Sequence, residues 1–174
     1  MPTQETTLDF LFSWYNLSER EWVAHMEKTL KINSINDMDQ LAESVAKGLT
    51  KGSVIGLAGD LGSGKTTFAK ALARHLGVFS TVNSPTFTLL KVYQGRLPFY
   101  HIDAYRLEQS HYDPALDDYI YGDGVCVIEW YPIIRSQLPE ERLTLDIIIT
   151  GPTSRILTIK GNGRYEKIVE TLGD

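Results

Sequence analysis

Residues 59–66 read Gly-Asp-Leu-Gly-Ser-Gly-Lys-Thr, which is the spacing of a phosphate-binding loop. Gly59, Gly62 and Gly64 let the backbone take positive φ and approach an anion closely. The amides of such a loop converge on phosphate oxygens at the positive end of the following helix. Lys65 supplies a positive charge for the β- and γ-phosphates, and the Thr66 hydroxyl can bind Mg²⁺. The pattern predicts a nucleoside triphosphate site.

Two acidic residues end apolar strands further along the chain. Asp103 closes the run 99–103, and Glu129 closes the run 125–129. In open α/β sheets, ligands bind at the carboxyl ends of the strands. Hydrolysis needs a second acid for the Mg²⁺ site and a group that places the attacking water, so we expect these two carboxylates to serve the loop. The alternative is a pair of solvated strand-end carboxylates.

Residues 83–88, Asn-Ser-Pro-Thr-Phe-Thr, carry hydroxyl groups around the stiff Pro85. Such a segment can sense a γ-phosphate in the manner of a switch, although a plain turn into a hairpin remains the alternative. His101 lies in a predicted strand with no nucleophile pattern around it, so we expect it to be packed rather than catalytic. The sequence leaves open whether Arg106 and Arg155 contact phosphates or cover the surface.

The elements that must position these residues follow from hydrophobic periodicity. Residues 53–58 predict a buried strand, and the helical spacing after the loop stops at Gly77. The other expected strands are 29–35, 88–93, 97–103, 125–130, 143–150 and 155–160, with helices at about 34–51 and 165–172 and a loop with a short helix at 107–124. The fold class is α/β, a P-loop NTPase-like three-layer α/β/α arrangement with a mixed parallel and antiparallel central sheet.

The composition is ordinary for one globular domain of 174 residues, with 43% hydrophobic and 22% charged residues. The net charge of −5 argues against a surface that binds nucleic acid directly, so an RNA-related role would run through a protein partner. The single cysteine, Cys126, is expected in the core. Neither a membrane span nor a secretory signal is evident, which predicts no membrane association and a cytoplasmic location.

The first 25 residues differ from the rest of the chain. They contain the aromatic run 10–15 and a possible capping box from Ser18 to Glu21. Met26 then precedes a sensible domain start. We therefore expect residues 1–25 to be an appendage or an upstream translation start, and residues 26–174 to form a single P-loop ATPase domain.

Two absences narrow the class of nucleotide-binding protein. No Asn-Lys-x-Asp string follows the loop, so the usual carrier of guanine specificity is missing. No arginine-rich lid segment of the kind found in small nucleotide kinases is evident either. A small-molecule kinase and a nucleotide-dependent binding module remain the alternatives to an ATPase.

Four motifs together resemble the TsaE family, formerly called YjeE, the bacterial ATPases of tRNA threonylcarbamoyladenosine biosynthesis. They are Gly59–Thr67, Asn83–Thr88, His-Ile-Asp-Ala-Tyr-Arg at 101–106 and Val-Ile-Glu-Trp at 127–130, within about residues 30–161. The departures are the first 25 residues, which have no family counterpart, a shortened 109–119 segment with Pro114, and Ser63 where alanine is common.

The resemblance implies ATP and Mg²⁺ as cofactors and TsaD and TsaB as protein partners, the pair that transfers threonylcarbamoyl to adenosine 37 of tRNA. ATP hydrolysis would reset that transferase, and tRNA would be met only through the complex. The Mg²⁺ ligands would be Thr66 and Glu129, and Lys65, Asp103 and Glu129 would be catalytic. The nucleotide would contact Gly59, Asp60, Leu61, Gly62, Ser63, Gly64, Lys65, Thr66, Thr67, Thr86, Trp130 and Arg155.

Overall fold

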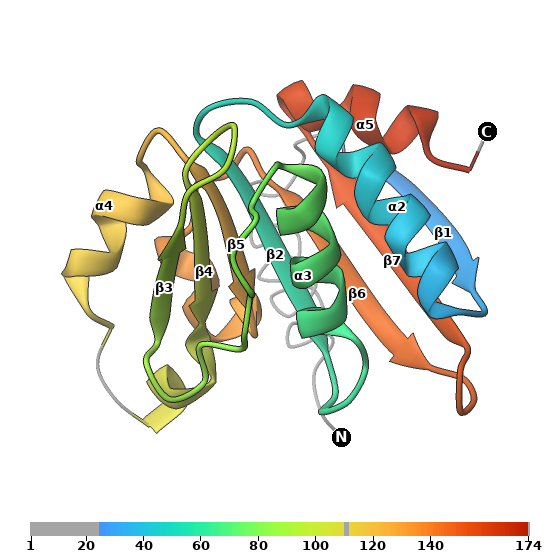
Figure 1. Cartoon of the computed structure of the whole chain (residues 1–174), viewed down its shortest axis with the longest axis horizontal. Coiled ribbons are helices and arrows are strands. Elements are labelled where there is room, and N and C mark those ends of the chain that lie inside the picture. The colour runs from blue at the N-terminus through green and yellow to red at the C-terminus, as the bar shows by residue number, and fades with distance from the viewer. Residues whose placement is uncertain (1–24, 110–111, 174) are drawn as a thin grey trace, which may run out of the picture.

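A seven-stranded mixed sheet forms the centre of the molecule, with the strand order β1-β7-β6-β2-β5-β4-β3. The computed structural model describes residues 25–109 and 112–173. The expected appendage and its capping box therefore lie outside the described residues, except for His25. Figure 1 shows the strands side by side, with helices α2 and α3 in front of the sheet.

The four inner strands run parallel to one another. They are β6 (Leu143–Ile149), β2 (Ser53–Gly59), β5 (Val125–Glu129) and β4 (Phe99–Asp103). Their residues are mostly apolar and mostly buried, which suits strands that are covered on both faces. Because they are parallel, their carboxyl ends all meet at one edge of the sheet.

Antiparallel strands complete both sides of this parallel core. β7 (Arg155–Gly161) returns from β6 as the expected hairpin, and β1 (Met26–Ile32) pairs with β7. On the other side, β3 (Leu90–Tyr93) forms the expected hairpin with β4. The mixed parallel and antiparallel sheet predicted from the sequence is thus confirmed.

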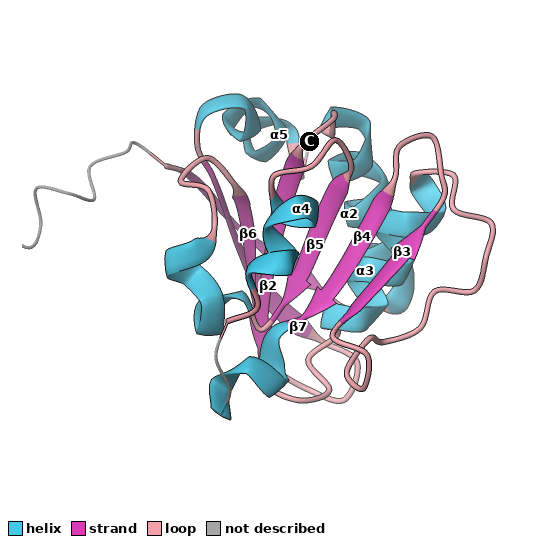
Figure 2. Ribbon diagram, turned by 90° about the vertical axis from the view of Figure 1, so that its left-hand side faces the viewer, coloured by secondary structure: helices cyan, strands magenta, loops and turns pink. Residues whose placement is uncertain are grey.

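The two faces of the sheet carry different layers. Helices α2 (Ile35–Gly48), α3 (Lys65–His75) and α5 (Glu166–Thr171) cover one face and form the larger hydrophobic core with it. The other face packs a smaller core against α4 (Asp117–Ile120) and the 3₁₀ turns 104–109, 114–116 and 131–137. Figure 2 shows α4 on the opposite side of the sheet from α2 and α3. Cys126 is buried in the smaller core, as expected.

The first predicted strand, 29–35, is displaced in the structure to 26–32 because a helix cap occupies its expected end. The Ser34 hydroxyl accepts a hydrogen bond from the Asp37 amide, and the Asp37 carboxylate accepts one from the Asn33 amide. These bonds start α2 at Ile35. The helix also ends earlier than residue 51, since Leu49 is already extended.

Two other boundaries shift for local reasons. β3 begins at Leu90 rather than 88, because the Pro85 carbonyl accepts hydrogen bonds from the amides of Thr88 and Leu89 and holds a turn there. β5 ends at Glu129 because Trp130 takes a left-handed conformation with φ of 59°. Within the described parts of the chain, no helix is long and apolar enough to cross a membrane.

Candidate functional site

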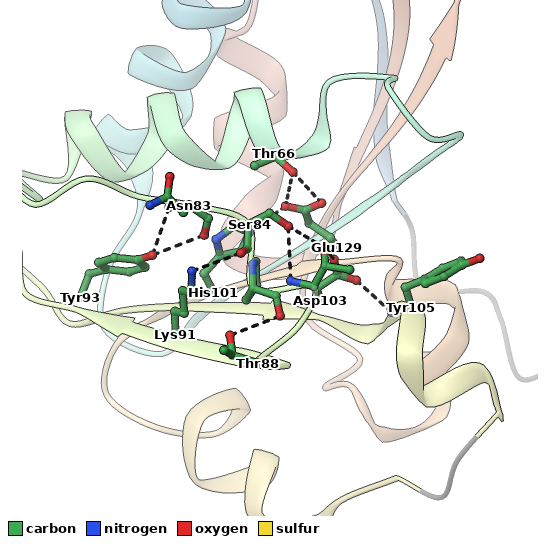
Figure 3. A network of polar contacts seen from close by, with 12 residues as sticks. Thr66, Asn83, Ser84, Thr88, Lys91, Tyr93, His101, Asp103, Tyr105 and Glu129 are labelled. Atoms are coloured by element: carbon green, nitrogen blue, oxygen red, sulfur yellow. Dashed lines mark hydrogen bonds and ion pairs between the residues drawn. The ribbon is translucent and has the colours of Figure 1, made fainter.

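The phosphate loop and the two predicted acids meet at the carboxyl edge of the parallel strands. Asp103 and Glu129 are direct neighbours in the β4–β5 register, and Glu129 also lies opposite Leu57 of β2. The loop leaves β2 just beyond that point. Sequence reasoning therefore placed both carboxylates at the correct edge, and the parallel register brings them side by side (Figure 3).

The loop backbone depends on glycine at two positions in particular. Gly59 has φ of 142°, and a Cβ there would lie 2.5 Å from the Ile147 carbonyl oxygen and 2.6 Å from Ser63 Oγ. Gly64 has φ of 114° and immediately precedes the first residue of α3. The positive φ at Gly64 lets the chain enter the helix with its first amides available to an anion.

Lys65 lies folded back into the loop. Its Nζ donates hydrogen bonds to the carbonyl oxygens of Gly59 at 2.6 Å and Asp60 at 2.9 Å, and lies 4.0 Å from the centroid of the Trp130 ring. Burial lowers the pKa of the Lys65 ammonium, while the carboxylates of Glu129, Asp103 and Asp60 act in the opposite direction. The ammonium group is therefore held among negative groups at the position where a phosphate would replace the loop carbonyls.

Thr66 and Glu129, which were expected to supply oxygen ligands, lie in hydrogen-bond contact. The Thr66 hydroxyl lies 2.8 Å from Glu129 Oε1 and 3.0 Å from Oε2. Glu129 is only 3% exposed, and His101 Nε2 lies 2.8 Å from Oε1 on its other side. His101 is buried, as expected, but no pattern in the sequence indicated that its ring would contact Glu129.

Thr86 and Asp103 form a second hydroxyl–carboxylate pair. Thr86 Oγ1 donates to Asp103 Oδ2 at 2.7 Å, and the Tyr105 amide donates to Oδ1 at 3.0 Å. Ser84 Oγ lies 2.6 Å from Thr86 Oγ1. The hydroxyl-rich segment thus reaches the site rather than merely leading into the hairpin.

Residues that the sequence analysis did not single out hold this segment in place. Lys91 Nζ donates to the Ser84 carbonyl oxygen at 3.2 Å, and the Tyr93 hydroxyl accepts from the Asn83 amide at 3.2 Å. Both lie on β3, as Figure 3 shows. The sequence places Lys91 and Tyr93 two residues apart in a predicted strand, but it does not show that they contact Ser84 and Asn83.

The predicted contacts at Trp130 and Arg155 have different surroundings. Trp130 lies beside Lys65 and packs its ring against Tyr105, with centroids 5.2 Å apart. Arg155 donates from Nε to the Ser63 carbonyl at 2.8 Å and from Nη2 to the Gly62 carbonyl at 3.2 Å. The guanidinium therefore holds the backbone of the phosphate loop.

A pocket of about 220 Å³ lies between these groups, and most of the predicted site residues line it. Four residues of the predicted set do not line it: Gly59, Asp60, Ser63 and Arg155. The carbonyl oxygens of Gly59 and Asp60 accept hydrogen bonds from Lys65, which does line it. Its lining consists of Leu61, Gly62, Gly64, Lys65, Thr66, Thr67, Ser84, Thr86, Asp103, Glu129 and Trp130.

A larger hollow of about 1020 Å³ shares no lining residue with this pocket. Tyr131, Arg142 and Asp146 are among its walls. It has neither a phosphate loop nor a glycine-rich turn among those walls, whereas Lys65, Asp103 and Glu129 all line the smaller pocket.

The fold and the site define an α/β protein with a P-loop-like architecture. A sequence profile for the family "Threonylcarbamoyl adenosine biosynthesis protein TsaE" matches residues 32–157. The chain therefore belongs to the TsaE family, whose members take part in tRNA threonylcarbamoyladenosine biosynthesis. The resemblance seen in the motifs is confirmed.

Relatives from two bacteria agree with this assignment. The Bacillus subtilis tRNA threonylcarbamoyladenosine biosynthesis protein TsaE is 45% identical over 149 residues, covering 83% of this chain and 94% of that protein. The protein of the same name from Treponema pallidum is 42% identical over 128 residues, covering 72% and 95%. The crystal structure of Bacillus subtilis YdiB superposes with a TM-score of 0.72 at 36% identity, covering 84% of this chain and 94% of that one.

Proposed function

We propose that the chain is a Mg²⁺-dependent ATPase that acts in tRNA threonylcarbamoyladenosine biosynthesis by resetting the TsaD–TsaB threonylcarbamoyl transferase between turnovers. The observation that carries the proposal is a pair of hydroxyl–carboxylate hydrogen bonds that line one phosphate-loop pocket. Thr66 donates to Glu129, and Thr86 donates to Asp103. A site built only to bind a nucleotide would not need a second buried carboxylate tied to a hydroxyl-rich segment. Its place in the cytoplasm, where tRNA is modified, belongs to the same proposal.

The oxygen ligands present fit Mg²⁺. Among the described residues there is no cluster of three or more His, Cys, Asp or Glu side chains able to hold a metal. Mg²⁺ in nucleotide sites takes one or two protein oxygens and completes its shell with phosphates and water. Thr66 and Glu129 offer such a pair, and the bound cation would neutralise charge on the phosphates.

Each remaining residue of the pocket has a distinct part in the proposal. The loop amides and the start of α3 bind the phosphates, and Lys65 transfers its hydrogen bonds from the loop carbonyls to the phosphate oxygens. Asp103 orients the attacking water and accepts its proton. Thr86 is placed to respond to the terminal phosphate, because its hydroxyl already contacts Asp103.

The decisive experiment measures ATP hydrolysis by this chain alone and with purified TsaD and TsaB. We expect weak turnover alone, a clear increase with both partners, and co-elution on a sizing column. The matched control is Lys65→Ala in the same mixture. Absence of both stimulation and co-elution would overturn the partner part of the proposal, and wild-type turnover no greater than that of Lys65→Ala would overturn the ATPase part.

A further inference from the structure

A histidine behind the proposed cation site has a contact that packing alone does not explain. His101 lies on β4 and is 0% exposed, yet its Nε2 lies 2.8 Å from Glu129 Oε1. Within the described chain its Nδ1 is buried without a hydrogen-bond partner. A buried polar atom without a partner costs stability, so an apolar residue would pack at this position at lower cost.

The sheet register explains why the ring reaches this carboxylate. His101 pairs with Val127, two residues before the Asp103–Glu129 pair. Residues two apart on a strand share a face, so His101 and Glu129 lie on the same face of the sheet. Phe99 is also a neighbour of the ring, with centroids 6.3 Å apart. The imidazole therefore has an aromatic ring and the Glu129 carboxylate as neighbours, and Figure 3 draws His101 and Glu129 in the same polar network.

The hydrogen-bonding partners define the orientation of the ring. An ionised carboxylate only accepts hydrogen bonds, so the short contact requires the proton on Nε2. Among the residues that the structure describes, Nδ1 has no acceptor to receive a proton from it. Glu129 Oε1 consequently accepts from His101, and the single Thr66 hydroxyl proton is shared between Oε1 at 2.8 Å and Oε2 at 3.0 Å.

These contacts restrict the rotation of the Glu129 carboxyl group. Because Oε1 also accepts from His101, Oε2 is the oxygen with fewer donors among the described contacts, and Glu129 lines the pocket. A group that fixes a ligand oxygen in this way typically changes metal affinity by roughly 10–100-fold when it is removed.

We propose that His101 is a positioning residue that orients the Glu129 carboxylate for the cation bound with the nucleotide. It acts through Glu129 and touches neither nucleotide nor cation. This inference rests on the proposed Mg²⁺–nucleotide site, and it assigns to the histidine a role separate from core packing.

The test titrates Mg²⁺ into the full chain with a fixed concentration of a fluorescent ATP analogue and records the Mg²⁺ midpoint of binding. For His101→Leu we expect the midpoint to rise roughly 10–100-fold. Nucleotide affinity in EDTA should stay within about twofold of wild type, since the phosphate loop is untouched. The matched control is Ile102→Val, a buried change on the opposite face of the same strand.

A second pair of variants keeps a polar side chain at position 101. The amide of His101→Gln extends far enough to replace the Nε2 donor, whereas the shorter amide of His101→Asn does not. We expect the glutamine variant to restore the wild-type midpoint to within about threefold and the asparagine variant to fail. These two variants decide the matter if His101→Leu does not fold.

The outcomes separate this inference from the proposed function. Wild-type protein that binds the analogue equally with Mg²⁺ and with EDTA would refute the proposed Mg²⁺ site itself. Wild-type protein with a clear Mg²⁺ midpoint, shared by His101→Leu or by both amide variants, would leave that site intact and overturn the role of His101.

Discussion

Asp103→Asn is the substitution that most directly separates binding from hydrolysis. The carboxylate is 2% exposed and accepts one hydrogen bond from Thr86 Oγ1 and one from the Tyr105 amide. The asparagine oxygen can keep the Tyr105 bond, and Thr86 can turn its hydroxyl proton toward Ser84 and accept from the new amide. We therefore expect stability within about 1 kcal/mol of wild type, the net value of one hydrogen bond.

Asp103→Ala is the matched comparison, because it removes both acceptors. Thr86 still has Ser84 Oγ at 2.6 Å, but the Tyr105 amide loses its partner. An unsatisfied donor of this kind costs about 1–3 kcal/mol. Urea unfolding of the two variants should therefore show the alanine protein to be the less stable one.

Nucleotide affinity should respond to Asp103→Asn in the opposite direction to turnover. The Asp103 carboxylate favours the charged form of Lys65, but it also repels a triphosphate, so its neutralisation should leave ATP affinity equal or tighter. Turnover with TsaD and TsaB present should fall by roughly 10²–10⁴, the usual contribution of a positioned acid or base. That loss corresponds to about 2.7–5.5 kcal/mol in the activation free energy.

Equilibrium titration with ATP and partner-stimulated phosphate release together measure the two effects. An Asp103→Asn protein that keeps more than about a tenth of the wild-type turnover would refute the role of Asp103 in hydrolysis. A parallel loss of affinity and turnover would refute it as well, since it would show that the carboxylate serves the shape of the pocket.

Three further substitutions test the loop, the sheet and a helix cap. Lys65→Ala should lower ATP affinity by roughly 100-fold in a titration, because a charge-assisted contact is worth about 3 kcal/mol; unchanged affinity would contradict the loop assignment. Gly56→Ala places a Cβ 2.5 Å from Tyr131 Cγ and should destabilise the protein by about 1–3 kcal/mol in urea, whereas unaltered stability would contradict this packing. Ser34→Ala should cost about 1 kcal/mol as the lost cap of α2, measured by thermal unfolding against Ser44→Ala on the exposed face of the same helix; equal effects would argue against the cap.

Much of the site could be predicted because its signals are local. The glycines and Lys65 of the loop are adjacent in sequence, and the strand that leads into the loop is a single apolar run. Asp103 and Glu129 each follow an apolar run, so their place at a strand end needs no tertiary information. That they become neighbours follows from the parallel pairing of β4 and β5.

The contacts that escaped prediction are non-local or depend on side-chain direction. The partner of His101 is 28 residues away and is set by strand register. Of the layer that holds α4, the sequence predicted only a loop with a short helix at 107–124. The 3₁₀ turns at 114–116 and 131–137 were not predicted, because they lack the 3.6-residue repeat of a helix. The expected β1 was misplaced because alternation in 29–35 continues into a capping sequence.

Arg155 shows how a residue can support the proposed nucleotide site from outside its pocket. A loop that turns its amides toward an anion must turn its carbonyls away, and those of Gly62 and Ser63 accept from the guanidinium. The same guanidinium donates to the Gly151 and Ser154 carbonyls, so it joins the turn between β6 and β7 to the loop. Direct contact between Arg155 and the nucleotide stays a prediction. The observed hydrogen bonds already account for the arginine structurally. They satisfy the carbonyl oxygens of the loop, whose amides would stay available for phosphate in the proposed site.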